Sequence, residues 1–393
     1  MEREKVAVIS PGAFAAPPGK SRSAERVIEQ MIPPASERLH IRIFGMADGH
    51  LPSQGWIGNV PCYRLPGGRL YLESLLRHLR KWRPETVDVH NRPLLACQLK
   101  GRLPLARVLL SLHSASLFAP SCHPKTCTLR MLETLDGLIV NSEFVRQELL
   151  AQFPQLHTPV WVNPPGVSPE EFIPRWTAEG EERRRVRLAE LGWERRKIVL
   201  WIGRLTLTNG VRHLLGAFPG VLAREPEAML VIVGSPYSGV LRDMELEREL
   251  KTLAADFGDR VALVPYTPYL KAADWYILAD CAAVTADDEA AFGLGMIEAM
   301  ASAVPVVVAG SGAVPGSIAD DYTGYPLIAE GPEDRLADRI VRLLEEKELR
   351  QAIGLAGREL ACSRFRWEHA ADRWADMMRA GSAELPDRRR VKN

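Results

Sequence analysis

The stretch Glu289–Ala301 carries the residues best suited to binding an anionic ligand. Gly293 and Gly295 leave the backbone bare where a loop turns into a helix-forming run, so the first N–H groups of that helix stay open to an anion. Glu298 follows about one turn into the helix, where its carboxylate would lie near the same helix start. This layout suits a ligand that carries both phosphate groups and a ribose. An ordinary buried helix start with small residues has the same pattern.

Strands and helices alternate along the chain, and polar residues gather just after the strand ends. Val6–Ile9 is the first strand, and a helix over Ala24–Met31 follows it. After a charged segment the pattern restarts with Ile198–Ile202, a strand that leads into Gly203 and Arg204. The restart predicts two Rossmann-like α/β halves, in which ligands bind at the carboxyl ends of the strands.

Composition is that of a globular protein with more than one domain. The chain has 393 residues, of which 46% are hydrophobic and 25% charged, and it is too long for one ordinary core. Up to residue 166 there are 20 Lys and Arg against 13 Asp and Glu, or +7, and the remainder holds 30 against 36, or −6. The basic first half indicates an anionic partner, such as a phosphorylated acceptor or a membrane surface, unless the charges are scattered and solvated.

The sequence gives no support for a membrane span, a disulfide framework, a metal site or a nucleic acid partner. Met1–Lys5 runs directly into a strand, and no apolar run is long enough to span a bilayer, so we expect a cytoplasmic protein. The six cysteines are scattered, and Cys122 and Cys127 lack a second Cys/His pair, so we expect neither a disulfide framework nor a metal site. The short basic tail lacks interleaved aromatic residues, and we expect no nucleic acid partner.

Taken together, these features resemble the GT-B glycosyltransferases, specifically glycosyltransferase family 4. The resemblance is densest at Gly203-Arg204-Leu205, Phe292–Ala301 and Ala303–Val306, and it covers about the whole chain. His90–Pro93 is similar to the spore-coat-associated branch. The resemblance implies a retaining hexosyltransferase that needs no cofactor and takes a sugar from a UDP- or GDP-sugar. Its acceptor would be a glycan, protein or lipid-linked group of the cell surface or spore coat, and peripheral membrane or spore-coat association is open.

The resemblance also implies an arrangement of domains. Two Rossmann-like domains would face each other across a cleft, with a C-terminal helix crossing back to the first. The predicted segments are an N-terminal acceptor-side domain (1–168), a linker with a surface helix (169–196), a C-terminal nucleotide-sugar domain (197–365), a terminal helix (366–380) and a disordered tail (381–393).

Individual residues take roles from the same resemblance. A departing nucleoside diphosphate gains negative charge, so cationic groups and N–H donors must point at its phosphates. Arg204 would bind the phosphates, Glu298 would accept from the ribose hydroxyls, and His113 would contact the sugar near the reacting carbon. The predicted catalytic residues are His113 and Glu289, and the predicted donor-binding residues are Lys20, Ser21, Arg22, Arg204, Asn209, Phe292, Gly293, Leu294 and Glu298.

Each of the three principal roles has a structural alternative. Arg204 would also suit a surface or interdomain ion pair, and His113 would suit capping of the sheet. Glu298 would suit a charge interaction with the N-terminus of its own helix.

Some positions depart from the family pattern. Asn209 stands where a lysine is usual, which removes a contact to a charged group worth about 1.5–3 kcal/mol. Ala290 occupies the position of the first family carboxylate, so Glu289 enters the pocket only if the loop bulges. Lys20 or Arg22 would have to supply the missing charge. The alternative to an active enzyme is therefore a catalytically degenerate GT-B protein that serves as a coat or envelope scaffold or binds nucleotide-sugar weakly.

Overall fold

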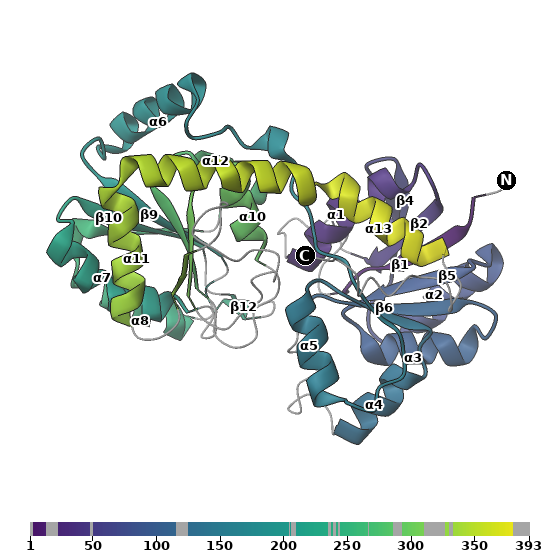
Figure 1. The fold of residues 1–393 in the computed structure, drawn as a ribbon. Coiled ribbons are helices and arrows are strands. Elements are labelled where there is room, and N and C mark those ends of the chain that lie inside the picture. Colours follow the sequence, from purple (N-terminus) through teal and green to yellow (C-terminus); the bar gives the residue numbers. More distant parts are fainter. Residues whose placement is uncertain are drawn as a thin grey trace, which may run out of the picture. The chain divides into compact units, whose positions relative to one another are not determined.

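Two α/β units, each with its own sheet, make up the computed structural model (Figure 1). The first unit holds Met1–Pro165 together with Trp367–Asn393, and the second holds Gly166–Arg366. The structure describes residues 3–12, 23–47, 50–114, 125–203, 205, 210–234, 237–238, 241–242, 244–265, 267–285, 293–309, 327–329 and 333–379. The chain therefore leaves the first unit once and returns to it with its last helix.

The first unit is built on an eight-stranded sheet in the order β3-β4-β2-β1-β5-β6-β7-β8. Its strands are β1 (Lys5–Ile9), β2 (His40–Met46), β3 (Gln54–Ile57), β4 (Val60–Leu65), β5 (Thr86–His90), β6 (Arg107–Leu112), β7 (Gly137–Val140) and β8 (Val160–Val162). All neighbours pair in parallel except β3 and β4, which are antiparallel. Parallel strands are buried on both faces, and β5 accordingly buries every residue, including the polar Asp88 and His90.

Apolar stripes attach the helices of this unit to its sheet. The helices are α1 (Ser23–Ala35), α2 (Leu70–Trp82), α3 (Pro93–Arg102), α4 (Lys125–Glu133), α5 (Glu143–Gln152) and α13 (Trp367–Arg379). The predicted helix over Ala24–Met31 is confirmed as part of α1, and Val27, Ile28 and Met31 are all buried. In α2 the buried residues recur at the spacing of a helical stripe, as in Tyr71, Leu75 and Leu79.

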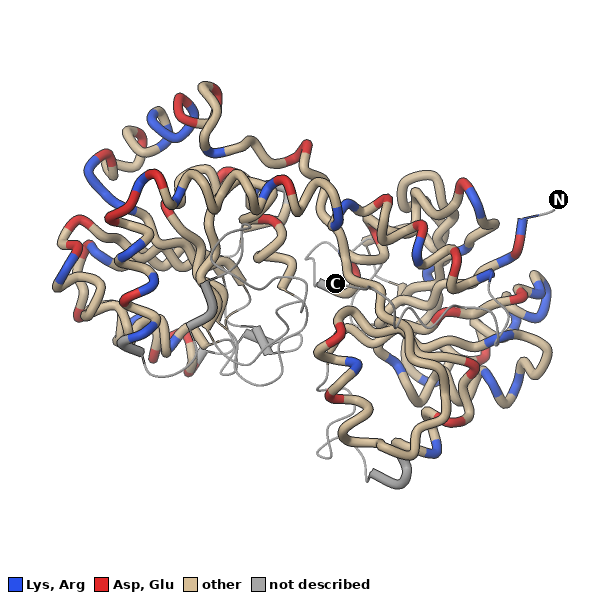
Figure 2. Tube along the Cα trace, viewed as in Figure 1, with Lys and Arg blue, Asp and Glu red and all other residues tan. Residues whose placement is uncertain are grey.

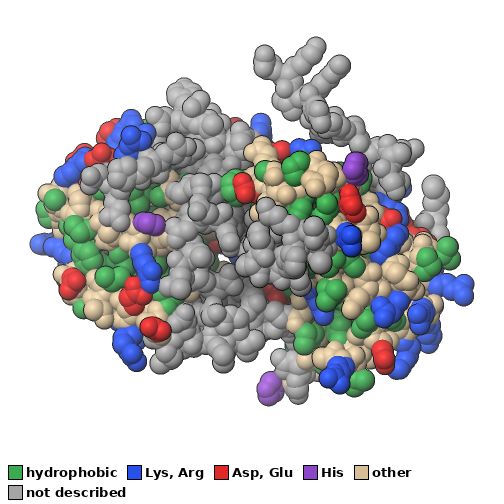
Figure 3. Space-filling view, turned by 90° about the horizontal axis from the view of Figure 1, so that it is seen from below, with side chains coloured by type: hydrophobic (Ala, Val, Ile, Leu, Met, Phe, Trp, Pro, Cys, Tyr) green, Lys and Arg blue, Asp and Glu red, His purple; other side chains and the backbone are tan. Residues whose placement is uncertain are grey.

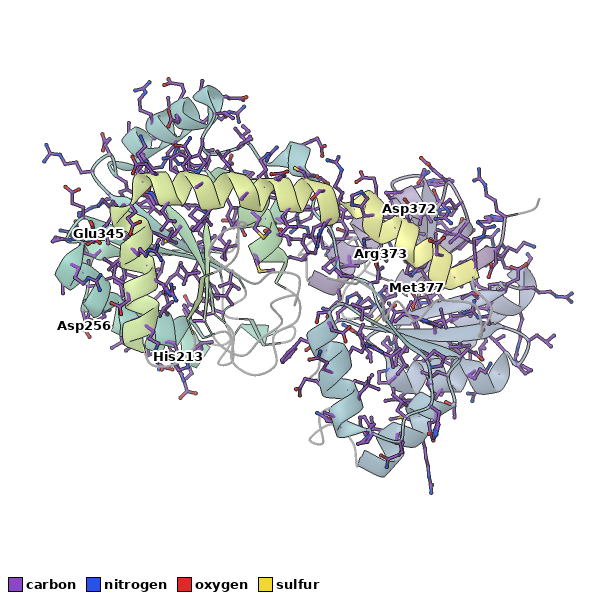
Figure 4. The ribbon with its side chains drawn as sticks, viewed as in Figure 1. His213, Asp256, Glu345, Asp372, Arg373 and Met377 are labelled. Atoms are coloured by element: carbon purple, nitrogen blue, oxygen red, sulfur yellow. The ribbon has the colours of Figure 1, made fainter. Side chains whose placement is uncertain are left out.

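The last helix is held to the first unit by polar and apolar contacts. α13 packs beside α1 (Figure 1). Arg373, labelled in Figure 4, donates to Oδ1 of Asn163 at 3.1 Å and to the carbonyl of Pro164 at 2.9 Å. Trp374 on the same helix is fully buried. The helix therefore contributes a side chain to the interior of a unit whose sheet was completed more than two hundred residues earlier.

The second unit has a six-stranded parallel sheet in the order β13-β10-β9-β14-β15-β16, together with a small β11–β12 hairpin. Its strands are β9 (Lys197–Ile202), β10 (Ala228–Val233), β11 (Tyr237–Ser238), β12 (Leu241–Arg242), β13 (Val261–Val264), β14 (Cys281–Thr285), β15 (Val306–Ala309) and β16 (Leu327–Ala329). Its helices are α6 (Ala178–Leu191), α7 (Val211–Arg224), α8 (Met244–Ala255), α9 (Ala273–Tyr276), α10 (Leu294–Ala301), α11 (Glu333–Glu345) and α12 (Lys347–Arg364), with short 3-10 turns η2 (Pro169–Glu171), η3 (Gly258–Arg260) and η4 (Tyr269–Lys271). The predicted restart at Ile198–Ile202 is confirmed by this second sheet.

Charges of both signs are spread over each unit. Lys and Arg positions are interspersed with Asp and Glu positions along the trace (Figure 2), and the face in Figure 3 shows both kinds among hydrophobic side chains. The anionic partner predicted from the charge count therefore depends on local clusters rather than on one broad field. Every helix in the described ranges is too short or too polar to cross a bilayer.

Candidate functional site

Polar side chains meet at the carboxyl ends of neighbouring strands in the first unit. β5 and β6 are parallel and pair His90 in register with Ser111, and β7 lies next to β6. His113 follows the end of β6, and Asn141 follows the end of β7. Because parallel strands end at the same edge of a sheet, the topology brings these four residues together.

Asp88 is the centre of this polar cluster and is fully buried. Its Oδ1 accepts from the Ser111 hydroxyl at 2.8 Å, and its Oδ2 accepts from the indole N–H of Trp374 at 2.7 Å. His90 Nε2 lies 3.1 Å from the same Oδ2. Burial acts to raise the pKa of Asp88, but the charge of His90 and hydrogen bonds to the carboxylate hold it below its ordinary value. Asp88 is therefore an ionised acceptor that orients His90.

His90 in turn faces His113, with 2.9 Å between His90 Nδ1 and His113 Nε2. The two rings share one hydrogen bond, and which ring donates depends on their tautomers. Burial, followed by the nearby His90, lowers the pKa of His113 to about 3. His113 is therefore neutral near pH 7, and its Nε2 is engaged with His90.

The backbone of His113 is fixed on both sides by side-chain amides. Its N–H donates to Oδ1 of Asn91 at 2.9 Å, and its carbonyl accepts from Nδ2 of Asn141 at 2.9 Å. Asn91 has a φ of 55°, in the left-handed region that asparagine tolerates better than most residues. The ring and the main chain of His113 are thus both positioned by neighbouring strand ends.

A small pocket opens onto this cluster. Its lining combines the polar residues with apolar side chains from α1 and α13, and consists of Val27, Met31, His90, Ser111, Leu112, His113, Ile139, Val140, Asn141, Asn163 and Trp374. A neutral, oriented imidazole beside such a lining can bind a ligand hydroxyl. It cannot act as a general acid near pH 7, because it carries no dissociable imidazolium proton there.

In the second unit, α10 begins where the sequence predicts an anion-binding helix start. Gly293 is its N-cap in an extended conformation, and no side chain caps the helix. The N–H groups at Leu294 and Gly295 belong to the first turn and have no partner within the helix itself. Gly293, Leu294 and Glu298 thus lie on or next to one short helix, which has the positive end of its dipole at Gly293.

Glu298 is held by a buried phenol. The carboxylate is 4% exposed, and its Oε2 accepts from the Tyr276 hydroxyl at 2.9 Å. Tyr276 itself is 1% exposed, and its hydroxyl also lies 3.2 Å from the carbonyl oxygen of Gly295. The Tyr276 contact fixes the side chain of Glu298 relative to the first turn of α10.

Close backbone packing marks the carboxyl edge of the second sheet. Gly210, the N-cap of α7, has a φ of 63°, and a Cβ there would lie 2.9 Å from Cβ of Thr285. Thr285 ends β14 and accepts from the indole N–H of Trp201 at 3.0 Å. A Cβ on Gly234 would lie 2.0 Å from the carbonyl oxygen of Gly203. Side chains larger than glycine are excluded at these positions.

Several predicted site residues lie outside the described residues. They are Lys20, Ser21, Arg22, Arg204, Asn209, Glu289 and Phe292, and Ala290 lies with them. Their roles stay predictions. The structure brings Gly293, Leu294 and Glu298 together in the second unit and places His113 in the first.

The sequence-based prediction missed Asp88, Trp374 and Tyr276 as supports of the site. Asp88 and His90 alternate along β5, and this period of two places them on one face of the strand. That spacing was a usable signal. Trp374 is 286 positions away from Asp88, and no local pattern links them.

Comparison with known proteins agrees with the predicted resemblance. Residues 184–360 match the model of the family described as Glycosyl transferases group 1. Spore coat protein SA of Bacillus subtilis (strain 168) is 27% identical over 371 residues, which cover 94% of this chain and 97% of that protein.

Solved structures show the same fold over nearly the whole chain. Sucrose-phosphate synthase from Thermosynechococcus elongatus superposes with a TM-score of 0.77 at 21% identity, covering 96% of this chain and 98% of that one. HepE from Anabaena in complex with UDP-glucose superposes with a TM-score of 0.75 at 16% identity, covering 95% and 99%. The predicted GT-B fold class, with two Rossmann-like domains, is confirmed.

Proposed function

Because residues 184–360 match the model of the Glycosyl transferases group 1 family, we propose that this protein is a retaining hexosyltransferase. The donor is a UDP- or GDP-sugar, and the acceptor is a glycan, protein or lipid-linked group of the cell surface or spore coat. Spore coat protein SA, similar over almost its entire length, supports the coat acceptor, and HepE with UDP-glucose supports the donor class. We further propose a cytoplasmic protein with peripheral attachment to membrane or coat.

The observation that carries this proposal is the open start of α10, with Glu298 held one turn further on. Transfer forms a bond between an acceptor oxygen and the anomeric carbon while the bond from that carbon to the diphosphate breaks. The acceptor proton leaves with the diphosphate. The departing oxygen gains negative charge, which N–H groups and the helix dipole at Gly293 and Leu294 stabilise. Arg204 adds a guanidinium to the same phosphates, and Glu298 binds the ribose.

His113 supplies the sugar contact in this proposal. Its Nδ1 hydrogen-bonds to a sugar hydroxyl, because Nε2 is engaged with His90. A neutral imidazole suits an uncharged hydroxyl and holds the sugar for attack without proton transfer to the protein. Glu289 is proposed as a second catalytic residue, and Asn209 as a neutral donor contact.

Turnover of a panel of UDP- and GDP-sugars tests the proposal. We expect release of nucleoside diphosphate with at least one donor, unchanged activity in the presence of a chelator, and a product that keeps the anomeric configuration of the donor in early NMR spectra. An inverted product would contradict retention. Loss of turnover on chelation would contradict the metal-free mechanism.

The second candidate is a degenerate GT-B protein, and Asn209 and Ala290 favour it because both replace polar or charged family positions. It predicts donor binding in calorimetry without release of diphosphate. Asn209→Lys with Ala290→Glu separates the two functions. Turnover that arises only in this double variant would establish that the natural chain is degenerate.

A further inference from the structure

A pocket lined mainly by charged side chains lies on the second unit, beside α6. It measures about 250 Å³ and is lined by Arg175, Glu181, Arg184, Arg185, Leu188 and Glu194. α6 carries most of this lining, with glutamates near its start followed by a run of arginines (Figure 2). Arg184 connects the pocket to Asp280, the residue just before β14. The pocket therefore lies toward the amino ends of the strands, whereas α10 begins beyond their carboxyl ends.

Arg175 is a buried cation in this pocket. Its side chain is 6% exposed, and its Nε and Nη1 have no hydrogen-bond partner in the described part of the chain. The guanidinium carbon lies 4.5 Å from the ring centre of Trp176, and the backbone N–H donates to the carbonyl of Ser302 at 2.8 Å. The segment is thus fixed in place with two buried guanidinium nitrogens unsatisfied, which is costly unless a ligand accepts from them.

Asp280, a buried carboxylate near Arg175, already accepts from other donors in the described part of the chain. Oδ2 of Asp280 accepts from Arg184 Nη2 at 2.6 Å and from the N–H of Ile198 at 2.8 Å. Its Oδ1 lies 3.9 Å from Nε of Arg350. Among the described residues, Arg175 therefore shares the carboxylate of Asp280 with Arg184 and Arg350.

The charge of Glu181 at the rim favours the charged form of Arg175, but no hydrogen bond joins the two among the described residues. Glu181 and Glu194 are exposed, and neither forms an ion pair with Arg175 among the described residues. Burial, followed by the charge of Arg184, lowers the pKa of Arg175 to about 10, so its guanidinium still carries its charge near pH 7.

We propose that this pocket binds a phosphate group, either as inorganic phosphate or as part of a small phosphomonoester. A phosphomonoester carries about −1.5 to −2 charges near pH 7 and several acceptor oxygens, which the unpartnered Nε and Nη1 of Arg175 can bind. Guanidinium groups suit phosphate oxygens, and the pocket is smaller than the 300–1,000 Å³ or so of drug-sized sites. The site is independent of the donor and acceptor assigned above.

Calorimetric titration of the whole chain with inorganic phosphate at low ionic strength tests the proposal. We expect Arg175→Met, which keeps the buried stem, to bind phosphate at least about tenfold more weakly than the natural chain. Glu181→Gln removes a repelling charge at the rim and should tighten binding about threefold. Arg183→Met is the matched control, because Arg183 is exposed on α6 and pairs with Glu179. It should leave binding unchanged.

Further titrations distinguish free phosphate from a phosphomonoester and this pocket from the predicted donor site. Tighter binding of glucose 6-phosphate than of inorganic phosphate identifies a phosphomonoester site, and equal or weaker binding identifies free phosphate. Acetate binding as tight as phosphate would overturn the phosphate assignment. Arg204→Ala should leave this site intact, because Arg204 belongs to the predicted donor site.

Thermal unfolding supplies a readout that does not need a measurable heat of binding. Phosphate should raise the Tm of the natural chain and of Arg183→Met, but not that of Arg175→Met. Circular dichroism checks that Arg175→Met is folded, and Glu181→Gln keeps the test open if it is not. No binding by the natural chain at millimolar phosphate, or full binding by Arg175→Met, would overturn the proposal.

Discussion

The two buried charged clusters of this protein differ in how their charges are balanced. In the first unit, the Asp88 carboxylate receives Ser111 and Trp374 as donors and lies against His90, which in turn holds His113. In the second unit, Arg175, Arg184 and Arg350 lie around Asp280, the buried carboxylate of this cluster among the described residues. We call the first cluster closed, because both oxygens of its carboxylate accept hydrogen bonds. We call the second open, because Nε and Nη1 of Arg175 have no partner among the described residues.

This difference indicates what each cluster can do. A closed chain of hydrogen bonds fixes one ring orientation, so it positions His113 and has little capacity to bind an additional charge. An open cluster retains unused donors in a pocket of about 250 Å³, and that favours a ligand of opposite charge. Both clusters are buried, so burial alone does not distinguish a positioning cluster from a binding cluster. The number of buried polar atoms that lack a hydrogen-bond partner does distinguish them.

Breaking the closed cluster at its centre should give the largest effect on stability. Asp88→Ala leaves the indole of Trp374, the hydroxyl of Ser111 and His90 without their acceptor, and we expect the free energy of unfolding to fall by about 3–5 kcal/mol. Urea denaturation measures it. Ser111→Ala removes only one donor and should cost about 1 kcal/mol. A cost for Asp88→Ala no greater than that of Ser111→Ala would mean that the cluster is not cooperative.

Removing the ring that the cluster positions should affect turnover more than binding. For His113→Ala we expect kcat/KM to fall about 2–10-fold, the equivalent of one lost neutral hydrogen bond of roughly 0.5–1.5 kcal/mol. His90→Phe should cause a smaller fall in kcat with little change in donor KM, since it releases the orientation of His113. If His113→Ala and the natural chain had equal kcat/KM, His113 would not belong to the sugar-binding site.

The neutral state of His113 predicts a dependence of stability on pH. Its folded pKa of about 3 lies below the ordinary value of 6.5, so between these values the unfolded chain binds a proton that the folded chain does not. Stability from this group is therefore complete above pH 6.5 and is lost as pH falls toward 3, by at most about 1.4 kcal/mol per pH unit. His113→Gln should flatten the stability curve in that window. A natural chain and variant with parallel curves would show that His113 is protonated in the folded state.

The sequence predicted the fold well because local patterns determine it. Apolar strands, alternating helices and the restart at Ile198–Ile202 required two Rossmann-like units, and α10 starts after Gly293 as predicted. The β3–β4 hairpin was missed, since Gln54–Ile57 is short and its burial alternates only weakly. Its turn includes Gly58, which has a φ of 57°.

The supports of the site were less predictable, because they depend on contacts between distant segments. Trp374 reaches Asp88 only once α13 has returned to the first unit. Arg175 follows Pro174 in a segment that looks like an exposed linker, and its burial arises from the packing of that segment against Ser302 and α6. Tyr276 had no motif of its own. Its role arises from the position of α9 beside α10.

The smallest expected effect concerns the hydrogen bond between Tyr276 and Glu298 in the second unit. Tyr276→Phe removes a single hydroxyl, so we expect the free energy of unfolding to fall by about 0.5–1.5 kcal/mol and donor affinity to weaken a few-fold, because Glu298 loses the contact that orients it. Tyr63→Phe in the first unit is the control, since the ring of Tyr63 stacks on Phe44 and its loss of a hydroxyl should change neither quantity. Weaker donor binding in Tyr276→Phe without a loss of stability would indicate that Glu298 acts on the donor directly. The reverse result, lower stability with unchanged donor binding, would place Glu298 outside the donor site and limit it to anchoring α10.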